Sequence, residues 1–207
     1  TYPKDMIFAK YVRFPHGVGK VESANVEEAK KVPGVLLIEV DLDKEAKYPG
    51  DRVGKIVAES SQAIDDAEAA LALKFDVGDP RTEPMKYYDG PAEPDQEQAE
   101  QLKQLYNKAD HVIESTYTTQ VQTHTCFEPH GCVVDYKDDS AKAWASTQGV
   151  IGWGEGLANA TGHPMSKVSV DSVYVGGGFG SKLGLGAEGK MAVEMSKKFG
   201  RPCRVVL

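Results

Sequence analysis

The strongest constraint on the fold is the run Gly-Gly-Gly-Phe-Gly-Ser-Lys at residues 176–182, which has four glycines in five positions. A β-type segment at 168–175 leads directly into it. After it comes an apolar stripe at i, i+4 spacing, formed by Ala187, Met191, Met195 and Phe199. Gly200 then ends the predicted helix. We therefore predict a strand, a glycine loop and a helix. The N–H groups of the loop could face an anionic or oxo group, or the loop could be a plain connection between the strand and the helix.

The glycine run matches neither of the common phosphate-binding motifs. Lys182 is followed by Leu183, so the G-x-x-x-x-G-K-[ST] pattern of a P-loop is absent. Gly176 and Gly178 supply a G-x-G pair, but the third glycine, Gly180, comes one residue too early for a dinucleotide-binding fingerprint. The run therefore does not indicate a nucleotide-binding protein.

The rest of the chain predicts an α+β fold in three parts. Residues 1–77 contain four candidate strands and a helix capped by Ser61; the strands lie at 6–12, 21–26, 35–40 and 53–58. Residues 78–110 are a proline-punctuated linker ending in a solvated helix at 95–108. Residues 111–207 contain strands at 112–119, 131–136, 141–145, 168–175 and 204–207, and helices at 150–161 and 187–199. The chain stops inside an apolar strand, so we expect a truncated domain.

Composition limits the possible partners. A net charge of −7 argues against nucleic acid, which needs a basic face. No apolar run reaches the ~18–20 residues of a membrane span. Residues 1–20 lack a signal-peptide core, which leaves a cytoplasmic or periplasmic location open. The three cysteines form no C-x-x-C pair and cannot hold an iron–sulfur cluster with four thiolates.

Two further segments could carry chemistry. His124, Cys126, His130 and Cys132 form two H-x-C pairs, so a zinc site is conceivable, although the spacing fits no common zinc motif and structural strand residues near a pocket are the favoured interpretation. Thr147 is a plausible helix cap, and Gln148 beside it could offer its amide to a ligand.

Read in order, the motifs resemble the molybdopterin-binding large subunit of the xanthine dehydrogenase/aldehyde oxidase family. The resemblance rests on Phe-Glu-Pro-His-Gly at 127–131, Ser-Thr-Gln at 146–148, the glycine run at 176–182 and Gly-Arg-Pro-Cys-Arg-Val at 200–205. The residues of the motifs at 127–131 and 176–182 most resemble those of the isoquinoline 1-oxidoreductase-like branch of the family. The chain would be an N-terminal fragment, with residues 1–77 as the α/β-hammerhead domain and 111–207 as the first part of the cofactor-binding domain.

The resemblance implies an oxidoreductase that hydroxylates an aldehyde or N-heterocycle with oxygen from water. Its cofactor would be molybdenum–molybdopterin in the cytosine dinucleotide form, with electrons leaving through 2Fe–2S clusters on a separate small subunit. The family's general-base glutamate lies far beyond this region. The chain alone is therefore expected to be inactive and to need the rest of the large subunit as well as the Fe–S subunit.

The resemblance also assigns roles to residues. Gln148 matches the glutamine that hydrogen-bonds an oxygen ligand of molybdenum, and Gly177, Gly178, Phe179 and Gly180 match the loop that brings N–H groups to the metal centre. Leu183 stands where xanthine dehydrogenases have a purine-binding glutamate, which argues for a less polar substrate. No protein side chain is expected to bind the metal. A non-catalytic interaction or assembly module of the same fold stays open as the alternative.

Overall fold

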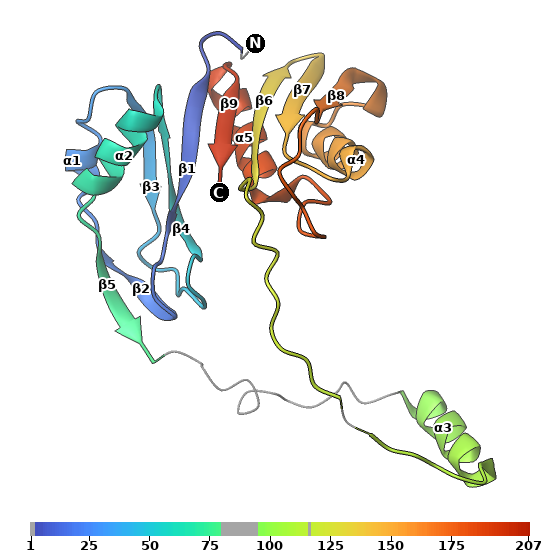
Figure 1. Cartoon of the computed structure of the whole chain (residues 1–207). Helices are drawn as coiled ribbons and strands as arrows, with labels where there is room; N and C mark the ends of the chain where they lie inside the picture. The colour runs from blue at the N-terminus through green and yellow to red at the C-terminus, as the bar shows by residue number, and fades with distance from the viewer. Residues whose placement is uncertain (1–2, 80–94, 116) are drawn as a thin grey trace. The chain divides into compact units, whose positions relative to one another are not determined.

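A computed structural model describes residues 3–79, 95–115 and 117–207 of the chain (Figure 1). The chain forms two compact units: residues 1–80 together with 124–207, and residues 81–123. Each unit is described by itself.

The larger unit is built on a seven-stranded sheet with the strand order β3-β4-β1-β9-β6-β7-β8 (Figure 1). In that order the strands are Val35–Val40, Arg52–Ala58, Ile7–Arg13, Cys203–Val206, Gly131–Lys137, Ser140–Ala145 and Val168–Asp171. The pairs β1–β9 and β7–β8 are parallel and the others are antiparallel. A separate two-stranded sheet pairs β2 (Val18–Ser23) with β5 (Lys74–Gly78). The predicted mixed α and β character is confirmed, whereas the hammerhead assignment of residues 1–77 stays a prediction.

Two hydrophobic cores lie on opposite faces of β1, because successive side chains of a strand point to opposite sides. Ile7 and Ala9 join a core with α4 (Val150–Thr161) and α5 (Gly186–Phe199). Phe8 and Val12 pack in a core with α2 (Ser61–Ala70), next to the short helix α1 (Val26–Ala29). Strands from both sides of the predicted boundary at residue 77 therefore share one sheet.

The helix after the glycine run follows the predicted pattern. Met191 and Met195 are buried on α5, and Gly200 ends the helix in the left-handed conformation with φ 62°. Helix α4 crosses over between the parallel strands β7 and β8, as a parallel connection requires. Both helices begin at the end of the sheet where β7 and β8 finish.

Several predicted elements are corrected. Residues 111–115 and 117–119 form no strand, and Ile113 and Tyr117 are 90% and 89% exposed, so the alternation there has no partner strand to stabilise it. The predicted strand at 168–175 ends at Asp171, and the chain then turns into the glycine loop. Ser60 rather than Ser61 caps α2, because the Ser60 side chain accepts the Ala63 N–H at 3.1 Å.

The smaller unit contains α3 (Gln96–Lys108), which confirms the predicted solvated helix because none of its residues is buried. Asp95 caps it by accepting the Gln98 N–H at 2.8 Å. Residues 80–94 of the predicted linker lie outside the described residues. None of the described helices combines the length and apolar character that crossing a membrane requires.

Candidate functional site

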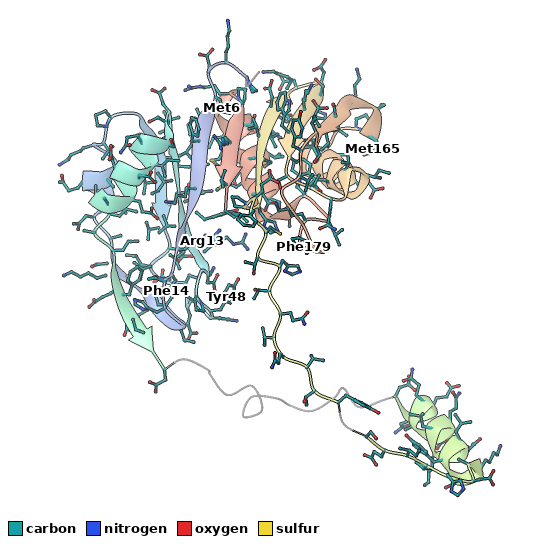
Figure 2. The ribbon with its side chains drawn as sticks, viewed as in Figure 1. Met6, Arg13, Phe14, Tyr48, Met165 and Phe179 are labelled. Atoms are coloured by element: carbon teal, nitrogen blue, oxygen red, sulfur yellow. The ribbon has the colours of Figure 1, made fainter. Side chains whose placement is uncertain are left out.

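Three loops meet at one end of the seven-stranded sheet. They are residues 124–130 before β6, 146–149 after β7 and 172–185 after β8. Since β7 and β8 are parallel, their carboxyl ends lie at the same edge, where open α/β sheets usually bind ligands. Phe179, from the third loop, is labelled in Figure 2. The sequence motifs at 146–148 and 176–182 lie in these loops, and so does the motif at 127–131 except for Gly131, which begins β6.

The glycine loop makes a tight turn with several positive φ angles. Gly177 and Gly180 have φ of 99° and 97°, which glycine adopts without strain. Phe179 has φ 50°, a conformation that costs a residue with a side chain on the order of 1–3 kcal/mol. The Ser181 N–H and hydroxyl both donate to the Gly178 carbonyl, at 2.9 and 2.8 Å, and so close the turn. The strained Phe179 is held 73% exposed at a site where loops converge.

Gln148 is fixed against this loop from two sides. Its side-chain oxygen Oε1 accepts the Gly180 N–H at 3.0 Å, and its backbone N–H donates to the Lys182 carbonyl at 3.0 Å. A Cβ at Gly178 would come within 2.1 Å of Oε1, so only glycine leaves room for the amide. With Oε1 occupied, the Nε2 amide group has no acceptor within the described part of the chain and is available to donate to a ligand.

The loop also presents backbone donors. Among the described residues, no acceptor pairs with the N–H groups of Gly177, Gly178 or Phe179. Three successive N–H groups beside a side-chain amide suit a ligand with oxo or phosphate oxygens. This donor set fits a molybdenum–pterin cofactor, which offers such oxygens, without needing a protein side chain as metal ligand.

Leu183 follows the loop with its side chain 59% exposed. Its carbonyl lies so close to the start of α4 that a Cβ at Gly149 would be 2.8 Å from the oxygen. The structure therefore holds the Leu183 backbone against the loop that carries Gln148. The Thr147 side chain accepts the Gly149 N–H at 3.1 Å, but Gly149 is the N-cap of α4, so the predicted capping role of Thr147 is corrected.

The zinc hypothesis is not supported. The described residues contain no group of three or more His, Cys, Asp or Glu side chains that could hold a metal ion. Cys132 is buried in the core on β6, where burial raises the pKa of its thiol well above the usual range, so it is not a ready thiolate ligand. His130 instead contacts the Ser181 carbonyl through Nε2 at 3.1 Å. The four residues are thus distributed between core packing and loop contacts.

Two buried charged residues were not predicted as part of the site. The Lys182 side chain is completely buried and contacts the other two loops through Glu128 and Ser146. Glu188, in the first turn of α5, is 4% exposed, and burial raises the pKa of its carboxyl group despite nearby His130, Arg52 and Lys182. A buried ionisable residue cannot be identified from local sequence, because charged residues are usually exposed.

Comparison with known proteins adds an independent result. Residues 83–207, more than half of the 207-residue chain, match the family described as "Molybdopterin cofactor-binding domain". The match includes the three loops and the glycine run.

Individual relatives extend the similarity to the rest of the chain. The chain is 25% identical to the aldehyde oxidoreductase molybdenum-binding subunit PaoC of Escherichia coli K12, over 91% of this chain and 29% of that protein. It is 24% identical to the nicotine 6-hydroxylase large subunit of Paenarthrobacter nicotinovorans, over 97% of this chain and 29% of that protein. The fold matches a reconstituted CO dehydrogenase from Oligotropha carboxidovorans with a TM-score of 0.79 at 19% identity, covering 100% of this chain and 32% of that one. The chain thus spans about a third of the length of these relatives.

Proposed function

Because the chain belongs to the molybdopterin cofactor-binding domain family, we propose that it forms part of the cofactor site of a molybdenum-dependent hydroxylase. The complete protein oxidises an aldehyde or an N-heterocycle, the substrate classes named for the E. coli and Paenarthrobacter relatives. Oxygen comes from water, and electrons leave through 2Fe–2S clusters on a partner chain. The cofactor is the cytosine dinucleotide form of molybdopterin.

The arrangement of Gln148 carries this proposal. When bound, the cofactor supplies the redox chemistry, and the residues of this chain hold it in place. Gly180 N–H bonds Gln148 Oε1, which leaves the Nε2–H group of the side chain to donate to a ligand oxygen. The N–H groups of residues 177–179, for which the described part of the chain offers no acceptor, add donors to the same site. Donors held in advance at an oxygen that gains negative charge stabilise a transition state without reorganisation.

Phe179 and Leu183 make the substrate side of the site apolar. Both side chains are exposed in this chain, at 73% and 59%. A leucine cannot provide the hydrogen bonds that a carboxylate gives to a polar substrate. This supports an aldehyde or a weakly polar N-heterocycle rather than a purine.

The remaining catalytic groups come from outside this chain. The relatives are about three times as long as the region matched, so further cofactor contacts and the general base belong to the rest of the large subunit. The chain by itself is therefore inactive. Its partners are that remaining part, the Fe–S subunit and a small-molecule substrate.

Elemental analysis of the protein purified from its native source, with the chains that accompany it, tests the proposal. We expect close to one molybdenum atom per complex, together with iron from a cluster-bearing small chain. A protein that contains neither molybdenum nor a partner chain would instead be a non-catalytic assembly module of this fold.

A further inference from the structure

Lys182, the last residue of the glycine run, has a side chain with 0% exposure. Lysine is almost never fully buried unless it is paired, because removing an ammonium group from water is costly. A buried lysine beside a ligand loop therefore needs a specific set of acceptors. The structure provides them from both neighbouring loops.

The Lys182 ammonium group joins the three loops of the site. Nζ donates to the Glu128 carbonyl at 2.7 Å and to Ser146 Oγ at 2.7 Å. It also lies 3.6 Å from the carboxylate oxygen Oε2 of Glu128. These acceptors come from residues 124–130 and 146–149, whereas Lys182 itself belongs to residues 172–185. Two of the three N–H donors of the ammonium group are thus hydrogen-bonded, and the Glu128 carboxylate supplies the opposite charge.

Glu128 holds the other end of the glycine run. Its Oε2 accepts the Gly176 N–H at 2.7 Å, and its backbone N–H donates to the Gly176 carbonyl at 3.2 Å. Burial by itself raises the pKa of Glu128, but the hydrogen bonds from Gly176 and Ser146 and the charge of Lys182 outweigh it and lower the pKa overall. The ionised form of Glu128 is therefore the one that this arrangement favours.

The backbone of Lys182 connects the same residue to Gln148. Its carbonyl accepts the Gln148 N–H at 3.0 Å and the Thr147 hydroxyl at 2.8 Å. The first residue of the glycine run, Gly176, is thus held by Glu128. The last residue, Lys182, is held by its own side-chain contacts, and its carbonyl also binds the Gln148 backbone.

We propose that Glu128 and Lys182 are positioning residues, which together set the glycine loop and Gln148 in register to receive the cofactor. This inference rests on the proposed function. Neither residue needs to touch the cofactor, because each acts through Gly176, the loop backbone or Gln148. Loss of the Glu128 carboxylate leaves the buried Lys182 ammonium group without its counter-charge, and loss of Lys182 removes the bonds that join the loops.

The test uses the native protein with Lys182→Met, Lys182→Arg and Glu128→Ala, and with Lys55→Met as a matched control. Lys55 on β4 is also a largely buried lysine, 18% exposed, and pairs with Glu39 at 3.1 Å and Glu194 at 2.8 Å. Two quantities are measured for each variant: amide hydrogen exchange along the chain, and molybdenum retained per protein after gel filtration.

We expect Lys182→Met to speed exchange in residues 176–182 by about tenfold or more and to lower retained molybdenum severalfold, since exchange reports local opening. Lys182→Arg keeps the charge, so both the slow exchange of residues 176–182 and the molybdenum content should be partly restored. Glu128→Ala, at a side chain that is 37% exposed, should fold and show the same loop-limited effect. Lys55→Met should leave the loop and the molybdenum content unchanged.

The proposal is overturned if Lys182→Met speeds exchange equally across β6, β7 and β9, since that would indicate a general role in packing. The proposal is also overturned if amide hydrogen exchange in residues 176–182 of Glu128→Ala is the same as in wild type. If Lys182→Met does not fold, the result for Glu128→Ala alone tests the proposal. A wild-type protein without molybdenum would refute the proposed function and the link to the cofactor. The exchange data would still show whether the two residues order the loop.

Discussion

The side-chain oxygen of Gln148 accepts a hydrogen bond from the backbone N–H of Gly180 at 3.0 Å, across 32 positions of sequence. This bond fixes which end of the amide is free, so that Nε2–H faces outward as a donor. A side chain at residue 178 would collide with the same amide, so the bond in this position requires glycine there. Two residues from different loops thus define one donor group.

Replacing Gln148 by Glu should separate anchoring from donation. A glutamate can still accept the Gly180 N–H but has no Nε2–H group to donate. We expect molybdenum content to stay near wild type while kcat falls about 10²-fold, the usual cost of losing one preorganised donor. Gln148→Ala removes both functions and should also lower molybdenum content. Equal kcat in wild type and Gln148→Glu, measured by steady-state kinetics, would contradict the donor role.

Gly178→Ala should displace the Gln148 amide, because the new methyl group would lie 2.1 Å from Oε1. Gln148 is exposed and can swing away, so we expect little change in the thermal unfolding midpoint but a clear loss of molybdenum and activity. Gly184→Ala is the matched control, since a Cβ there meets nothing within 4 Å. If both variants behave alike, the close approach of Gln148 to Gly178 does not matter for function.

Glu188→Gln should change how stability depends on pH. Burial raises the folded-state pKa of Glu188 above its usual 4.5, so the folded protein binds this proton more tightly than the unfolded chain does. The stabilisation from protonated Glu188 is complete below the unfolded pKa and is lost as pH rises through the folded value. The slope for one proton is at most about 1.4 kcal/mol per pH unit.

An uncharged glutamine should remove this loss, so that the variant is at least as stable as wild type at neutral pH. Urea unfolding from pH 4 to 8 measures the difference. A variant that becomes less stable than wild type as pH rises would show that ionised Glu188 is favourably paired.

Leu183→Glu should shift substrate preference toward polar heterocycles. A carboxylate at this exposed position can hydrogen-bond a purine but is poorly placed against an apolar aldehyde. We expect kcat/KM for an aromatic aldehyde to fall about tenfold relative to kcat/KM for a purine, consistent with 1–3 kcal/mol for a changed pocket contact. Leu183→Met is the control and should leave the ratio unchanged.

Local patterns predicted the elements that local forces stabilise. The stripe Met191–Met195 with Gly200 identified α5, because amphipathic spacing and a glycine C-cap act within a few residues. The solvated helix α3 was predicted instead from its polar, Gln- and Glu-rich composition, and none of its residues is buried. The strand at 112–119 was wrong because alternation alone does not supply a hydrogen-bonding partner. The two-stranded sheet was missed in part because β5 has no buried residue, so its sequence shows no alternation of buried and exposed positions.

The sequence by itself determined the family and the residue types of the site, since both are carried by short motifs at 127–131, 146–148 and 176–182. Only the tertiary structure decided how these motifs act together. Lys182 and Glu128 are 54 positions apart, and nothing local to either predicts their contact. The parallel pairing of β7 with β8 brings the loops that follow them to one edge of the sheet. The Lys182 side chain is buried there and is stable only because acceptors from the neighbouring loops bind it. The physical reason is that pairing over long sequence separations and the loss of water around a charge exist only in the folded chain.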